Sequence, residues 1–210
     1  MRACISQYDV AATGPTAETA IYQGNPFSPH VKFQDSQNVK NFHRGPKPRF
    51  WVWRTSMTTP KERLNDLDLT LPEAPKPVAA YVPSVRTGNL LYISGQVPFR
   101  DGQLLATGPV PSAVSIEQAQ DAARQCVLNA LAVLNDAVEG DLDRVRRIVR
   151  LGVFVASDPG FTDQPKVANG ASELLQDIFG ELGRHARAAV GSIALPLGAT
   201  VEVEMIVEID

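Results

Sequence analysis

The chain has 210 residues, is 44% hydrophobic and 20% charged, and carries a formal net charge of -3, an ordinary composition for a globular protein. This balance excludes the strongly basic footprint of most nucleic-acid-binding domains. No apolar run approaches the roughly 20 residues that a membrane-spanning helix requires. Two cysteines make no disulfide framework, and the N-terminus lacks the apolar core of a signal peptide, so a cytoplasmic location is the default expectation.

Residues 1–56 differ in composition from the rest of the chain. This segment holds seven Lys or Arg against three Asp or Glu, a charge of +4, which leaves -7 for residues 57–210. It shows neither a helical nor a strand period. We interpret it as a leader, either sequence upstream of a true start at Met57 or a disordered basic tail. A single folded domain is expected over residues 57–210.

From Met57 onward the pattern becomes regular. A Pro-rich lead-in over residues 72–77 can be neither a helix nor a central strand. Ser115 and Gln118 form a capping box that predicts a helix start, and Asp101-Gly102 predicts a turn. Cys126 lies among apolar helix positions and is expected to be buried. The expected elements are strands over 81–85 and 90–95, a helix over 115–138, a strand over 145–155, a helix over 166–179, and strands over 189–194 and 200–209.

The order β-β-α-β-α-β-β predicts an α+β domain in which two helices cover one face of a mixed sheet. The other face of the sheet then has no element of the chain to cover it. That face must be polar or buried by further subunits, which favours a closed cyclic oligomer.

The last strand alternates apolar and acidic residues. Val201, Val203 and Met205 point to one face, while Glu202 and Glu204 point to the other. Upstream stands Arg187, whose planar guanidinium suits a carboxylate and stays charged at physiological pH. One interpretation is a site for a small carboxylated molecule. The other, more common in proteins, is a surface arginine beside an edge strand with solvated glutamates.

Other chemistries find little support in the sequence. His30, His43 and His185 are scattered, and no Cys or His pair has metal-ligand spacing. A nucleophile elbow and a phosphate-binding glycine loop are both absent from the sequence. The chemistry that remains is binding together with activation of a water molecule.

A set of short motifs runs in unbroken order from about Pro77 to Glu208. They are Tyr81-Val82, the strand ending Ile93-Ser94-Gly95-Gln96-Val97-Pro98, Phe154-Val155, Asn169, Ala186-Arg187 with Val190, Leu195-Pro196 and Val201-Glu202-Val203-Glu204. Together these motifs resemble the RidA/YjgF family of enamine/imine deaminases, which older naming calls endoribonuclease L-PSP.

The resemblance implies a chorismate-mutase-like fold in a homotrimer, with three sites in clefts between subunits and no cofactor. It implies that a 2-imino acid, or its 2-enamino tautomer, is hydrolysed to a 2-keto acid and ammonia. Arg187 is expected to bind the substrate carboxylate bidentately, and Glu202 to position or polarise the attacking water. The other residues expected at the cleft are Tyr81, Ser94, Gly95 and Asn169.

The chain departs from the family pattern at several positions. The Gly-Arg-His-Ala-Arg run over residues 183–187 and the Pro-Leu-Gly-Ala run over residues 196–199 resemble a divergent branch of the family. Ala188 and Ala189 stand where many members carry a hydroxyl and a thiol, and the loop over residues 157–165 is longer than in short members. Two alternatives to a deaminase follow. A non-catalytic trimer that binds keto or amino acids and regulates a partner would use the same Arg187. A ribonuclease or translation inhibitor is disfavoured by the charge of residues 57–210.

Overall fold

The computed structural model describes residues 58–74 and 80–210, so the interpretation of residues 1–56 and of Met57 lies outside the described residues. No helix within these ranges is both long enough and apolar enough to cross a membrane. The helices are α1 (Pro60–Asp66), α2 (Ile116–Ala137) and α3 (Gln164–Phe179), with short 3-10 turns η1 (Leu142–Arg144), η2 (Gly180–Gly183) and η3 (Pro196–Gly198). The strands are β1 (Ser84–Thr87), β2 (Leu90–Gln96), β3 (Phe99–Arg100), β4 (Gln103–Leu104), β5 (Val145–Ala156), β6 (Ala186–Ser192) and β7 (Val201–Ile209).

Five strands form one mixed sheet in the order β1-β2-β7-β5-β6. Only β5 and β6 are parallel neighbours, and α3 supplies the crossover that such a pair requires. Strands β3 and β4 form a separate hairpin, whose two-residue turn is the expected Asp101-Gly102. Both turn residues have positive φ, 51° and 78°, as the tight hairpin turn demands. The prediction of a mixed sheet is therefore confirmed.

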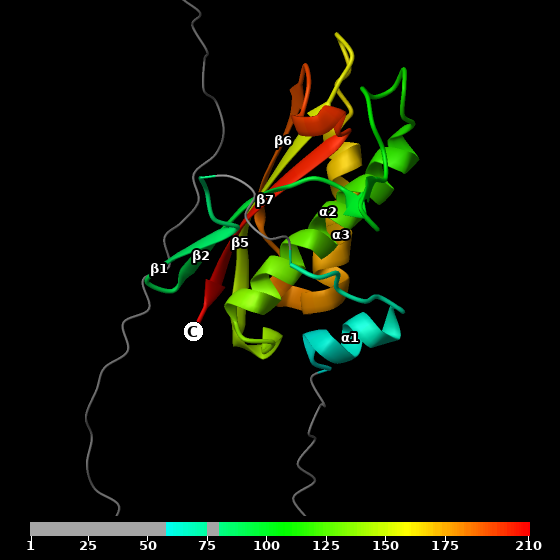
Figure 1. The fold of residues 1–210 in the computed structure, drawn as a ribbon. Helices are drawn as coiled ribbons and strands as arrows, with labels where there is room; N and C mark the ends of the chain where they lie inside the picture. The colour runs from blue at the N-terminus through cyan, green and yellow to red at the C-terminus, as the bar shows by residue number, and fades with distance from the viewer. Residues whose placement is uncertain (1–57, 75–79) are drawn as a thin grey trace, which may run out of the picture. The chain divides into compact units, whose positions relative to one another are not determined.

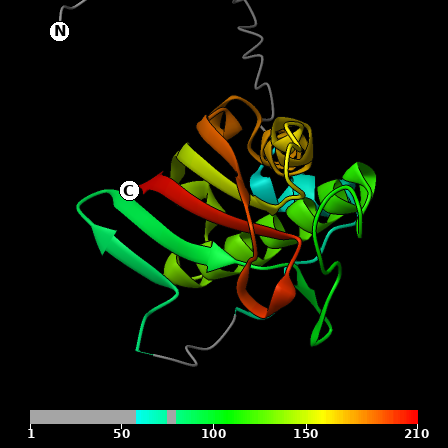
Figure 2. The same cartoon turned by 90° about the horizontal axis from the view of Figure 1, so that it is seen from above.

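Helices α2 and α3 lie together on one face of this sheet (Figures 1 and 2). The capping box of α2 forms as predicted, with Ser115 and Gln118 each accepting from the other's backbone N–H. The two helices approach closely at Gly170, where an added Cβ would lie 2.4 Å from the backbone oxygen of Gln120. Cys126, which belongs to α2, is fully buried, as expected.

A third helix, α1, was not expected from the sequence, so the count of two helices is wrong. Thr59 and Glu62 form a capping box around a proline at the first helical position. The helix packs on α3, where Arg63 Nη1 donates to the backbone oxygen of Asp177 at 3.2 Å. Seven residues with one buried side chain, Leu64, are too few to show a helical period.

Two strand boundaries also differ from expectation. Strand β1 begins at Ser84, so Tyr81 precedes the strand. Strand β6 spans Ala186–Ser192, so Arg187 lies within a strand. The reason is pairing: β6 joins β5 from the Arg150–Ala186 pair onward, and this tertiary contact extends the strand past its apolar stretch.

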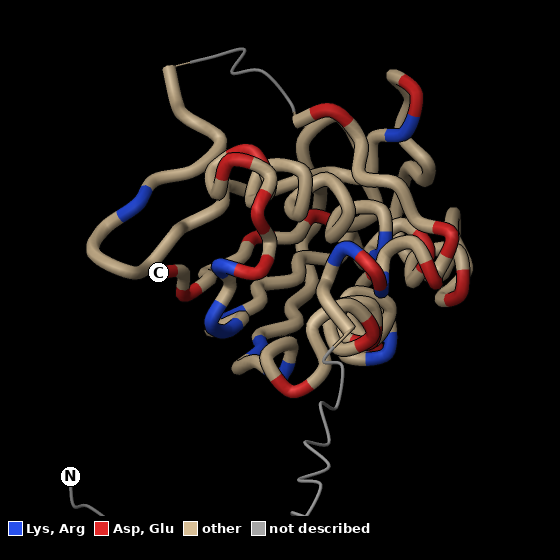
Figure 3. The backbone as a smooth tube through the Cα atoms, turned by 90° about the horizontal axis from the view of Figure 1, so that it is seen from below, with Lys and Arg blue, Asp and Glu red and all other residues tan. Residues whose placement is uncertain are grey.

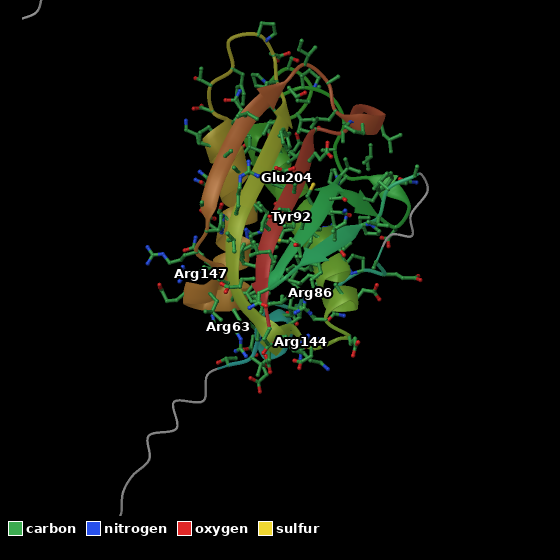
Figure 4. All side chains as sticks on the ribbon, turned by 90° about the vertical axis from the view of Figure 1, so that its left-hand side faces the viewer. Arg63, Arg86, Tyr92, Arg144, Arg147 and Glu204 are labelled. Carbon is green, nitrogen blue, oxygen red and sulfur yellow. The ribbon has the colours of Figure 1, made fainter. Side chains whose placement is uncertain are left out.

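The face of the sheet opposite α2 and α3 carries charged and aromatic side chains. Along β7 the alternation holds, with Val201, Val203 and Met205 buried and the two glutamates between them half-buried. Figure 4 shows Glu204 and Tyr92 on this face, with α2 and α3 behind the sheet. Glu204 pairs with Arg150 Nη1 at 2.7 Å, and Tyr92 is 43% exposed. No described element covers this face.

Candidate functional site

The first group of site residues surrounds Arg187 on the edge strand β6. Its Nη1 donates to Asn169 Oδ1 and to Ser172 Oγ, both at 3.0 Å. Both partners stand on α3, three residues apart and therefore on one side of that helix. Among the described residues the guanidinium of Arg187 has no other hydrogen-bond partner, so the edge formed by Nε and Nη2 is available to a carboxylate.

His185 extends this group behind Ser172. Its Nδ1 lies 2.6 Å from the backbone oxygen of Gly183, and its Nε2 lies 3.0 Å from Ser172 Oγ. A carbonyl oxygen only accepts, so Nδ1 carries the proton, and Nε2 accepts from the serine hydroxyl. Burial lowers the pKa of His185. The hydrogen bond to Gly183 opposes this effect, whereas the positive charge of Arg187 adds to it. This lowered pKa favours the neutral imidazole at physiological pH.

The second group surrounds Glu202 on β7. Its carboxylate lies over the backbone of Gly95, so closely that a Cβ on this glycine would fall 1.9 Å from Glu202 Oε1. Both residues line a cavity of about 830 Å³, together with Tyr81. Burial raises the pKa of Glu202, and the negative charge of Glu204 raises it further. A raised pKa makes the ionised carboxylate a stronger proton acceptor than an ordinary surface glutamate.

Ser94 supports the cavity wall instead of lining it. Its Oγ donates to the backbone oxygen of Val82 at 2.9 Å. This bond ties the segment that carries Tyr81 to strand β2. Tyr81 itself is 56% exposed, which leaves its ring accessible at the mouth of the cavity.

Within one chain the two groups lie on opposite faces of the sheet. Arg187 is paired with Leu151 of β5, which is fully buried toward the helices, whereas Glu202 is paired with Phe154. Leu151 and Phe154 are three positions apart on one strand, so their side chains point to opposite faces. The structure thus brings Tyr81, Gly95 and Glu202 together in one group. Arg187 and Asn169 belong to the other group.

Sequence reasoning missed Ser172 and gave His185 no definite place. The signal for Ser172 was its spacing of three from Asn169 on a predicted helix, which puts the two side chains on one face. Within residues 58–74 and 80–210, no three His, Cys, Asp or Glu side chains come together as a candidate metal site.

Comparison with known proteins identifies the family. A family model described as "YjgF/chorismate_mutase-like, putative endoribonuclease" matches residues 61–209. The chain belongs to the RidA/YjgF family. The resemblance noted in the sequence is thereby confirmed, as is the chorismate-mutase-like fold of a mixed sheet packed with helices.

Three similar proteins each align with this chain over more than nine-tenths of their own length. Protein TCP17 of Trypanosoma cruzi is 47% identical over 148 residues, covering 70% of this chain and 92% of its own. A 2-iminobutanoate/2-iminopropanoate deaminase of Dermatophagoides farinae is 31% identical over 144 residues, covering 68% and 95%. The crystal structure of Atu1372 from Agrobacterium tumefaciens, a protein of unknown function, is 48% identical with a TM-score of 0.68, covering 72% of this chain and 94% of its own.

Proposed function

We propose that this RidA/YjgF protein hydrolyses 2-imino acids, or their 2-enamino tautomers, to 2-keto acids and ammonia. The observation that carries the proposal is the separation of Arg187 from Glu202 into two half-sites. One offers a guanidinium edge to a carboxylate, and the other a half-buried carboxylate beside a cavity. The relative named as a 2-iminobutanoate/2-iminopropanoate deaminase supports this substrate class.

A complete site then requires two copies of the chain. We propose a homotrimer in which Arg187 and Asn169 of one copy face Tyr81, Gly95 and Glu202 of the next. The uncovered sheet face supports such an assembly, because it exposes apolar side chains that a closed cyclic oligomer would bury. The apolar or aromatic side chains exposed on strands of this sheet are Val85, Tyr92 and Val190.

The reaction needs little beyond orientation. Arg187 takes the substrate carboxylate on its Nε–Nη2 edge and holds C2 of the imine against the facing half-site. Glu202 accepts a proton from a water molecule as the water oxygen bonds to C2, and passes that proton to the imine nitrogen to give a carbinolamine. Glu202 then carries the hydroxyl proton of the carbinolamine to the same nitrogen, so that the C–N bond breaks, ammonia leaves and the 2-keto acid forms. Because the imine bond is intrinsically reactive toward water, no covalent intermediate on the protein is required.

A ribonuclease activity draws no comparable support from the charge distribution. Figure 3 shows Lys and Arg positions interspersed with Asp and Glu positions along the described backbone. Arg144 and Arg146 form a local basic cluster, but both pair with Asp210. A phosphate backbone is normally met by a stripe of unpaired basic groups.

The test generates imines in situ with an amino-acid oxidase and traps what escapes hydrolysis with semicarbazide. We expect the parent protein to reduce the trapped product. Arg187→Lys, which keeps the charge but loses the planar fork, is expected to leave the trapped product unreduced. No reduction by the parent with several imino acids would overturn the deaminase. Binding of 2-keto acids without turnover would then assign the non-catalytic binder.

A further inference from the structure

The hydrogen bonds behind Arg187 form a directional chain. Arg187 Nη1–H donates to Ser172 Oγ, the Ser172 hydroxyl donates to His185 Nε2, and His185 Nδ1–H donates to the Gly183 oxygen. The direction of donation along this series is fixed at both ends, because the guanidinium only donates hydrogen bonds and the carbonyl only accepts them. Ser172 is 8% exposed, so its hydroxyl is held by these two partners and not by bulk water.

We infer that Ser172 and His185 are positioning residues that hold the Arg187 guanidinium with its Nε–Nη2 edge presented to the substrate carboxylate. This inference rests on the proposed function. An arginine on an exposed edge strand otherwise samples many rotamers, and fixing it in advance removes that entropic cost from substrate binding. Asn169 fixes the same nitrogen from the other side, so Nη1 is anchored twice while the opposite edge stays open.

The last acceptor in this series of hydrogen bonds is a backbone group, the carbonyl oxygen of Gly183. A Cβ on Gly183 would lie 2.2 Å from the backbone oxygen of Leu175, so only glycine lets η2 come this close to α3. This close contact sets the Gly183 carbonyl where His185 Nδ1 can donate to it. Burial favours the neutral imidazole, and this is the form in which Nε2 can accept a hydrogen bond from the Ser172 hydroxyl. A protonated Nε2 could no longer accept it.

The substrate carboxylate does not change its charge during hydrolysis, so its contact with Arg187 has similar strength in the bound substrate and in the transition state. Loosening the guanidinium should therefore raise KM and leave kcat nearly unchanged. We expect Ser172→Ala to raise KM for 2-iminobutanoate about tenfold, the usual effect of losing a hydrogen bond to a charged group. His185→Phe should act in the same direction, while His185→Gln, which keeps an acceptor oxygen, should restore KM to within about threefold.

The experiment measures kcat and KM on these variants of the full chain, and by calorimetry the Kd for 2-oxobutanoate, the product acid. Ser112→Ala is the matched control, because it removes a serine hydroxyl that bonds Asp158 Oδ1 at 3.0 Å, away from this cluster. Nitrogen-15 NMR of the parent, assigned by difference from His185→Gln, should show the proton of His185 on Nδ1.

The outcomes separate this inference from the proposed function. Turnover by the parent with unchanged KM and Kd in Ser172→Ala overturns the positioning role alone. A fall in kcat without a change in KM does the same, and so does failure of His185→Gln to recover what His185→Phe loses. A parent that neither turns over imines nor binds 2-oxobutanoate overturns both.

Discussion

The close contact between Gly95 and Glu202 makes Gly95→Ala an informative perturbation. The backbone of Gly95 does not lie in the left-handed region, so alanine fits it without strain. The new Cβ would fall 1.9 Å from Glu202 Oε1, whereas Cβ contacts under 3.0 Å are essentially never found. The carboxylate must therefore retreat by about 1 Å or more, and it can do so because it ends a flexible side chain.

The consequence for catalysis follows from this displacement. Misplacing a catalytic group by about 1 Å costs roughly 100-fold in rate, which corresponds to about 2.7 kcal/mol. Stability should change little, because no backbone atom is displaced and replacing glycine by alanine itself favours the folded state by about 0.4 to 1 kcal/mol. We therefore expect kcat/KM to fall about 100-fold while the melting temperature stays within about 3 °C of the parent.

The assay is imine hydrolysis followed with the semicarbazide trap, on the parent, Gly95→Ala, Glu202→Gln and the double variant. If Gly95 acts only by leaving room for the Glu202 carboxylate, the glycine substitution should cost nothing further once that carboxylate is gone. A full 100-fold loss in the Glu202→Gln background would refute this reasoning. It would show that the glycine instead admits the substrate itself.

Three further predictions concern the assembly, the pH dependence and the core. Mixing Arg187→Lys and Glu202→Gln chains in equal amounts in one oligomer should restore about a quarter of the parental activity, since an intact Arg187 and an intact Glu202 then meet in one site in four. A mixture no more active than either variant would place both residues of a site in one chain. Glu204→Gln removes one of the two causes that raise the pKa of Glu202, the other being burial. The acidic limb of the kcat/KM profile, where the Glu202 carboxylate becomes protonated, should therefore move to lower pH. An unmoved acidic limb would exclude Glu202 as the titrating group. Gly170→Ala forces α2 and α3 apart at the Gln120 backbone and should cost about 1 to 3 kcal/mol in thermal or urea unfolding; an equally stable variant would contradict this account of their packing.

The elements best predicted from the sequence are those whose pattern is local. The Ser115–Gln118 box begins α2 because the side chains that cap a helix lie within one turn of each other. Strand β7 alternates because each of its faces meets a different environment along its whole length, and the period of two is written directly in the residues. The family resemblance rested on motifs of the same local kind, and the family comparison confirmed it.

What the tertiary structure alone decided is where these local elements meet. Strand β6 begins at Ala186 because β5 offers it a partner there, a fact that no pattern within β6 contains. The same pairing turns Arg187 toward α3 and Glu202 toward the other face, so two residues expected in one site lie on opposite faces of the sheet within one chain. The hydrogen bonds from Arg187 to Ser172 and from Ser172 to His185 likewise join an edge strand, a helix and the segment between them. Contacts between distant elements depend on packing geometry, which the order of residues specifies only through the fold as a whole.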